Sequence, residues 1–165
     1  MSKVDLRVDW CSYDAAKYAV EHWHYSHSMP AGRNVYLGVW ENEKFVGVVV
    51  FGMGSGNSTN GNRYGLNASH EMAELTRVSL TKHQMQVSRI VSIAIRMLKK
   101  QSPGIRLLTS MADPRAGHVG GIYQAMNWVY TGETKPDVLY FSRGEWVHHR
   151  TATSCLLYTS PSPRD

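Results

Sequence analysis

The spacing of apolar residues along the chain predicts two amphipathic helices and one shorter helix. Apolar residues recur three and four positions apart over residues 13–23 and 87–100, which is the spacing of one buried helical face. The second of these helices ends at Ser102-Pro103-Gly104, because proline and glycine both interrupt helices. A shorter helix is expected near residues 121–126.

Runs of β-branched and aromatic residues predict the strands. Residues 35–40 and 45–51 are separated by only four polar residues, so a β-hairpin is expected there. Residues 74–80 alternate between apolar and polar types, and residues 105–110 have the composition of a short buried strand. Three more short strands are expected at residues 128–131, 138–142 and 145–149.

The order of these elements predicts an α/β or α+β fold. The early strands are joined by a hairpin and the later ones alternate with helices, so we expect a mixed central β-sheet flanked by helices in one domain. A loop rich in Gly, Asn and Ser spans residues 52–65. Its length suits a functional lid or DNA clamp, and equally an unconstrained extension of the hairpin.

The composition is that of a globular chain, and it sets the last residues apart. The 165 residues are 42% hydrophobic and 19% charged, which excludes a disordered chain or a coiled coil. No apolar run reaches the ~20 residues of a membrane span, and the first residues lack the apolar core of a signal peptide. A cytoplasmic protein that does not associate with membranes is therefore expected.

Residues 155–165, CLLYTSPSPRD, match the translation of a transposase-type sequencing-library adapter. Segments of that origin are left out of fold reasoning. We therefore expect the natural domain to cover residues 1–154 and to lack its own C-terminus.

Positive charge is concentrated in the second half of the chain. Residues 1–75 hold six Lys/Arg and eight Asp/Glu, a net −2, whereas residues 76–165 hold twelve and five, a net +7. Such asymmetry favours a face that meets nucleic acid, a phosphorylated cofactor or both. A solvated basic face is the alternative interpretation.

The start of the helix at residues 87–100 is the first candidate site. Helix N-termini present unpaired N–H groups and the positive end of the dipole, so they bind phosphates. Residues 81–89, TKHQMQVSR, add a hydroxyl and several cations around this start. An ordinary solvated helix face fits the same pattern.

Two other segments carry candidate chemistry. Residues 22–27, HWHYSH, place three histidines within six positions, which suits a metal site or simply a helix end with exposed histidines. In residues 111–124, Asp113 follows a strand, where acidic groups are often functional, and Tyr123 is a candidate proton donor. A turn residue and a packed aromatic are the respective alternatives.

These segments together resemble a known family. The runs WHYSHSMPAGRN, VYLGVWENEKFVGVVVFGMG, ELTRVSLTKHQMQVSR and SMADPRAGHVGGIYQAMNWVYTGET are similar to the Mom proteins of bacteriophages, DNA-modification enzymes with a GNAT-like (N-acetyltransferase-like) fold. The resemblance covers about residues 20–152. The GNAT pyrophosphate loop, Q/R-x-x-G-x-G/A, falls on residues 84–89, with Val87 and Arg89 in the Gly or Ala positions.

The resemblance implies an activity and a set of site residues. Mom-type enzymes convert adenine in double-stranded DNA to a carbamoylmethyl derivative at its exocyclic amine, which shields phage DNA from restriction in the host cytoplasm. An acetyl-CoA-like donor is implied by the fold. The implied catalytic residues are His24, Tyr25, Asp113 and Tyr123. The implied donor-binding residues are Arg77, Val78, Ser79, Gln84, Val87, Ser88 and Arg89.

Bonding at the methyl carbon of an acetyl group is harder than acyl transfer, so a redox-capable metal is one way to supply the chemistry. Iron held by His24 and Asp113, with Tyr25 or Tyr123 as a further ligand, is the metal hypothesis. The target base is expected to leave the duplex stack. Expected contacts to DNA phosphates are Arg33, Arg63, Arg115, Arg143, Arg150, His148 and His149.

Two other functions remain open. One is a conventional GNAT N-acetyltransferase that acts on a small molecule or a protein. The other is a noncatalytic DNA-binding module. The specific run from Asp113 to Tyr130 favours the DNA modifier over the conventional enzyme, and a binding module has no need of a histidine–tyrosine pair and an acidic group.

Overall fold

The computed structural model describes residues 4–53, 63–67, 69–133, 139–142 and 145–148, and only the backbone of Arg115 and of the last two strands. The chain forms two compact units, residues 1–129 and 130–165, and each is described by itself. Most of the 52–65 loop, all of residues 155–165, and the expected DNA contacts Arg143, Arg150 and His149 lie outside the described residues.

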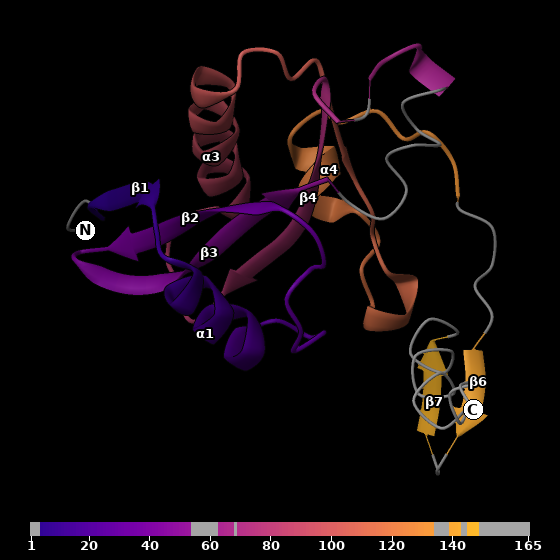
Figure 1. Cartoon of the computed structure of the whole chain (residues 1–165). Coiled ribbons are helices and arrows are strands. Elements are labelled where there is room, and N and C mark those ends of the chain that lie inside the picture. The colour runs from indigo at the N-terminus through magenta and orange to yellow at the C-terminus, as the bar shows by residue number, and fades with distance from the viewer. Residues whose placement is uncertain (1–3, 54–62, 68, 134–138, 143–144, 149–165) are drawn as a thin grey trace, which may run out of the picture. The chain divides into compact units, whose positions relative to one another are not determined.

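The first unit is built on a five-stranded sheet in the order β1-β2-β3-β4-β5 (Figure 1). The first four strands pair antiparallel, and β5 pairs parallel with β4. The predicted mixed sheet of an α+β fold is therefore confirmed, whereas the GNAT-like assignment stays a prediction. The strands are β1 (Leu6–Trp10), β2 (Asn34–Glu41), β3 (Lys44–Gly52), β4 (Met72–Leu80) and β5 (Leu107–Ser110).

Two helices, α1 (Tyr13–Trp23) and α3 (Val87–Gln101), cover opposite faces of this sheet (Figure 1). Alternate residues of β3 face each helix, because successive strand side chains point to opposite sides. Val48 and Val50 pack with α1, and Phe51 packs with α3. Both helices end within one residue of their predicted bounds. Among the described residues, no helix is long and apolar enough to cross a membrane.

Two predictions about strands fail. β1 is not predicted, although its partly buried Leu6 and Val8 alternate with exposed Arg7 along the sheet edge. The predicted strand at residues 128–131 is wrong, because no strand is assigned there. Instead, the Trp128 N–H donates to the Tyr123 carbonyl at 3.0 Å, and the two rings pack with centroids 5.3 Å apart. A tertiary contact thus overrides the strand propensity of this run.

The remaining elements follow β5. A short 3₁₀ turn, η1 (Pro114–Ala116), and the helix α4 (Gly121–Ala125) complete the first unit. In the second unit, β6 (Leu139–Ser142) and β7 (Glu145–His148) pair antiparallel as a separate two-stranded sheet. Both strands match their predicted ranges to within one residue. The expectation of one domain over residues 1–154 stays a prediction.

Candidate functional site

A cavity opens where the parallel strands β4 and β5 stop pairing. The two strands pair only from Met72 with Leu107 to Leu75 with Ser110, where β5 ends, while β4 continues to Leu80. The cavity has a volume of about 310 Å³ and is lined by residues 24–25, 75–78, 111–112 and 117–123. The cavity therefore brings together residues that directly follow α1, residues of β4, residues that follow β5, and residues of α4.

Three of the four predicted catalytic side chains line this cavity, namely His24, Tyr25 and Tyr123. Asp113 is not among the lining residues. Its carbonyl accepts the N–H groups of Ala116 and His118 at 3.1 and 3.2 Å, so its backbone shapes the turn ahead of α4. A catalytic role for Asp113 stays a prediction.

His24 is held in one orientation directly after α1. Its N–H donates to the Val20 carbonyl at 3.2 Å, and only 8% of the residue is exposed. Nδ1 lies 2.8 Å from the Ser26 hydroxyl and accepts the Ser26 backbone N–H at 3.1 Å. Because a backbone N–H can only donate, the neutral ring carries its hydrogen on Nε2.

The electrostatics around His24 keep the ring uncharged. Burial is the largest cause, followed by the positive field of Arg77 and by His118 and His27, and together they lower the pKa of His24 to about 4. At neutral pH the side chain is therefore a neutral imidazole with one N–H donor. This state suits donation to a ligand atom that gains electron density, without a formal charge on the ring.

Aromatic rings form one side of the cavity. The Tyr25 ring lies 4.3 Å from His24 and 5.0 Å from His118, measured between centroids. Tyr25 is 50% exposed, so it forms part of the rim. The role of His118 is not predicted from the sequence, although the residue belongs to the Gly-His pair of the run that resembles the family.

Arg77 ties the segment after α1 to β4. Its Nε donates to the Ser28 carbonyl at 3.2 Å, and one terminal nitrogen donates to the Thr76 carbonyl at 2.8 Å. Burial lowers the pKa of this guanidinium, while Tyr25 and Glu74 oppose that shift. Arg77 and Val78, both predicted to bind a donor, line the cavity. A positive charge thus lies at the wall shared with His24.

Tyr123 is anchored through a hydroxyl that the sequence does not single out. Ser110 Oγ lies 2.7 Å from the Tyr123 hydroxyl and 2.8 Å from the Leu75 carbonyl. A carbonyl only accepts, so the one Ser110 hydrogen satisfies Leu75 and the Tyr123 O–H can donate to Ser110. The Tyr123 oxygen then keeps a free acceptor site. The only sequence signal for Ser110 is a hydroxyl residue at the end of a strand.

The other predicted donor-binding residues lie elsewhere. Ser79 is buried and donates to the Ala19 carbonyl at 2.6 Å, so it joins α1 to β4. Val87, Ser88 and Arg89 form the first turn of α3 and do not line the cavity. Gln84 lies at a second cavity. Donor binding by these residues stays a prediction.

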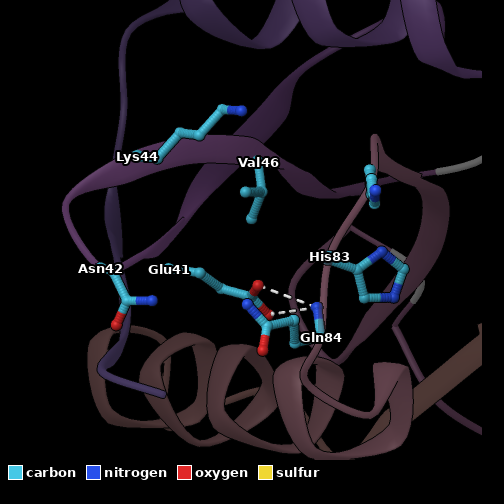
Figure 2. Close-up of a pocket in the computed structure, with 7 residues that line it drawn as sticks. Glu41, Asn42, Lys44, Val46, His83 and Gln84 are labelled. Carbon is cyan, nitrogen blue, oxygen red and sulfur yellow. Dashed lines mark hydrogen bonds between the residues drawn. The ribbon is translucent and has the colours of Figure 1, made fainter. Parts of the chain in front are cut away.

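The second cavity has a volume of about 440 Å³ and lies beside the turn ahead of α3 (Figure 2). Glu41, at the end of β2, directs its carboxylate at the main chain of this turn. The Gln84 N–H donates to both carboxylate oxygens at 3.1 and 2.8 Å, and the Met85 N–H donates to Oε1 at 2.7 Å. The lining residues are Glu41, Asn42, Lys44, Val46, Lys82, His83 and Gln84.

A row of buried oxygens crosses the sheet near the first cavity. Among the described residues, Asn34 Oδ1, Glu74 Oε2 and Thr109 Oγ1 are the buried side-chain atoms without a hydrogen-bond partner. The strand register aligns Asn34 with Gly52, Gly52 with Glu74, and Glu74 with Thr109, so all point to one face. Burial raises the pKa of Glu74, with Arg77 opposing.

The metal hypothesis gains no support from a cluster of acidic, histidine or cysteine ligands. No three His, Cys, Asp or Glu side chains among the described residues lie closely enough to hold a metal ion. In the tautomer set by Ser26, His24 carries a hydrogen on Nε2 rather than a lone pair. The metal hypothesis for His24 and Asp113 stays a prediction, and no step is derived through iron.

The turn ahead of α3 offers few free amides to the diphosphate of an acetyl-CoA-like donor. The Gln84 and Met85 amides of this turn are already bonded to Glu41. The acetyl-CoA hypothesis stays a prediction, and no step is derived through that cofactor. Of the expected DNA contacts whose side chains are described, Arg33 and Arg63 are exposed.

Comparison with known proteins bears on this arrangement. A model of the Mom protein family matches residues 5–160. The chain is also 30% identical over 150 residues to the methylcarbamoylase mom of Escherichia phage Mu, and the aligned region covers 89% of this chain and 61% of that protein. The chain therefore spans about three fifths of the length of this curated relative.

Proposed function

Because the chain belongs to the Mom protein family, we propose that it is an enzyme that attaches a carbamoylmethyl group to the exocyclic amine of adenine in double-stranded DNA. The observation that carries the proposal is the convergence of His24, Tyr25, Arg77 and Tyr123 on one cavity. The name of the phage Mu relative, a methylcarbamoylase, supports the same group. Protection of phage DNA from host restriction is the proposed purpose.

The cavity side chains suit an acceptor that is a weak nucleophile. The lone pair of the exocyclic amine is delocalised into the adenine ring, so the amine needs orientation more than a strong base. The free acceptor site on the Tyr123 oxygen can receive one N–H of the amine. Neutral His24 can donate from Nε2 to a ring nitrogen or to the incoming group.

The walls and size of the cavity suit one flat base. A volume of about 310 Å³ is at the low end of the ~300–1,000 Å³ range of small-molecule sites. Tyr25, His24 and His118 offer ring faces on which an extruded base can stack. The net +7 of residues 76–165 supports contact with the DNA backbone, because Lys and Arg neutralise phosphates.

Arg77 supplies a fixed positive charge at this wall. Two of its nitrogens are bonded to carbonyls, so the guanidinium cannot swing freely away from the cavity. Such a charge stabilises negative charge that develops on a departing group during transfer. The identity of the donor, including an acetyl-CoA-like molecule, stays a prediction.

Nucleoside mass spectrometry tests the proposal. DNA from cells that express the chain is digested to nucleosides and compared with DNA from cells that express the Tyr123→Phe variant. We expect an adenosine heavier by one carbamoylmethyl group only with the unaltered chain. An adenosine heavier by an acetyl group would favour the conventional N-acetyltransferase. Unchanged nucleosides, with a folded chain that retains DNA, would favour the noncatalytic module.

A further inference from the structure

Glu41 is buried beside the turn of the β2–β3 hairpin, and its carboxylate accepts hydrogen bonds from backbone donors. It is 6% exposed, and its two oxygens accept the Gln84 amide at 3.1 and 2.8 Å (Figure 2) and the Met85 amide at 2.7 Å. Hydrogen bonds from backbone N–H groups to a carboxylate are charge-assisted and strong. The turn ahead of α3 therefore already holds an anion, and that anion belongs to the protein.

The first turn of α3 contains no acidic residue, and the residue at its N-cap, Gln86, makes no capping hydrogen bond with its side chain. A negative group near a helix start is favourable, because the start is the positive end of the helix dipole. Glu41, in a strand 43 residues away in sequence from Gln84, places its carboxylate on the two residues just ahead of the N-cap.

The turn is also held in place by apolar contacts. Met85 and Val87 pack against the core that lies between α3 and the sheet. Val87 and Arg89 stand where a pyrophosphate loop would have Gly or Ala, whose small size permits close approach of a phosphate. A diphosphate would thus have to displace a buried carboxylate and approach a turn with bulkier side chains.

We propose that Glu41 is a specificity-determining residue that closes the turn ahead of α3 to phosphate-bearing ligands. The donor of this protein is consequently one that does not anchor a diphosphate on the Gln84 and Met85 amides. Lys44, Lys82 and His83 line the cavity beside Glu41. Removal of the carboxylate therefore leaves free amides next to cationic side chains, which is an anion site.

The experiment follows the Gln84 and Met85 amide resonances by ¹⁵N NMR while inorganic pyrophosphate, and separately coenzyme A, is added. The proteins are the unaltered chain, Glu41→Ala and Glu43→Ala. Glu43 is a matched control, because it lies in the same hairpin with its side chain 78% exposed. We expect saturable shifts at both amides only in Glu41→Ala. Pyrophosphate should bind this variant at least about tenfold more tightly than the unaltered chain or Glu43→Ala, a difference equivalent to about 1.4 kcal/mol.

Two results would overturn the proposal. One is saturable movement of both amides in the unaltered chain at concentrations similar to those needed for Glu41→Ala. The other is no gain of pyrophosphate binding in a folded Glu41→Ala protein, because Glu41 would then not be what closes the turn. If Glu41→Ala does not fold, Glu41→Gln, which removes the charge but keeps the shape, takes its place with the same expected direction.

The outcome is separable from the proposed DNA modification. The amide shifts report on ligand binding at the turn, whereas the nucleoside spectra report on transfer to adenine. Loss of the adenine product would leave the Glu41 assignment intact, and anion binding by the unaltered chain would leave the adenine assignment intact.

Discussion

The cavity where β4 and β5 part and the turn ahead of α3 are both polar, yet their backbone and side-chain groups differ in what they already bind. In the cavity, neutral His24 keeps an N–H donor and the Tyr123 oxygen keeps an acceptor site. At the turn, the Gln84 and Met85 amides already donate to Glu41. The difference teaches that backbone amides near a helix start are open to a ligand only when the protein does not supply its own anion to them.

The two regions also use their charges differently. Arg77 is restrained by two carbonyls and faces the cavity, so its charge remains available to a ligand. The charged oxygens of Glu41 are bonded to the protein's own amides, so this charge contributes to the stability of the fold. Variants in the cavity should therefore affect activity first, and variants at the turn should affect stability first.

The largest effect is expected for the cavity residues. Tyr123→Phe and His24→Gln should each reduce the yield of modified adenosine by about 100-fold, the low end of what positioned proton donors and acceptors contribute. Tyr18→Phe and His22→Gln, on the exposed side of α1, should leave the yield unchanged. Equal yields from the cavity variants and these controls, measured by nucleoside mass spectrometry, would contradict the site.

Glu41→Ala should lower the free energy of unfolding by about 2 kcal/mol, because it removes charge-assisted hydrogen bonds to two backbone N–H groups of a partly buried turn. Urea denaturation measures the change. Glu43→Ala removes only an exposed ion pair with Arg7 at 3.9 Å, so it should cost less than about 0.5 kcal/mol. Equal losses in the two variants would mean that the turn does not depend on Glu41.

Ser110→Ala should reduce modification by about tenfold, since it removes the hydroxyl that orients Tyr123, an effect equivalent to 1.4 kcal/mol. Ser110→Thr keeps a hydroxyl and should recover most of the yield. A merely structural role would not predict this recovery. If Ser110→Thr is as impaired as Ser110→Ala at equal protein stability, the hydroxyl does not position Tyr123.

Glu74→Gln should stabilise the fold slightly at neutral pH. The pKa of Glu74 is raised above its ordinary value of 4.5, so the folded state holds this proton more tightly than the unfolded chain does. The contribution of Glu74 to the free energy of unfolding is therefore fully present below pH 4.5. It is lost as the pH rises through the pKa of Glu74 in the folded state. At pH 8 the variant should be more stable by about 1 kcal/mol, with no difference at pH 4. Thermal unfolding of the variant and the unaltered chain at both pH values measures this effect. The same difference in stability at pH 4 and pH 8 would contradict the raised pKa.

Much of the fold was predictable because it depends on local pattern. The apolar spacing in α1 and α3 and the composition of β2 and β3 locate these elements within a few residues. β1 is missed because it is a short edge strand, with only Leu6 and Val8 facing inward. Residues 128–131 have strand composition, but the contact of Trp128 with Tyr123 decides their conformation.

The candidate site was predictable only in part. His24, Tyr25 and Tyr123 belong to segments that resemble the family, and the structure brings them to one cavity. Ser110, His118 and Glu41 also lie in such segments, but the sequence assigns them no role, because their roles arise from partners that are distant in sequence or from the direction of a side chain. The same holds for the row formed by Asn34, Glu74 and Thr109, which requires the strand register.

The sequence by itself determined the elements of the fold, its mixed α and β character and the family, because periodicity and motifs are properties of neighbouring residues. Only the tertiary structure decided which of the two polar regions keeps unbonded donors and acceptors for a ligand. The parting of β4 and β5 after Leu75 creates one cavity, and the hairpin that carries Glu41 to the Gln84 amide closes the other site. Hydrogen-bond satisfaction between distant segments is the physical reason, and linear spacing does not encode it.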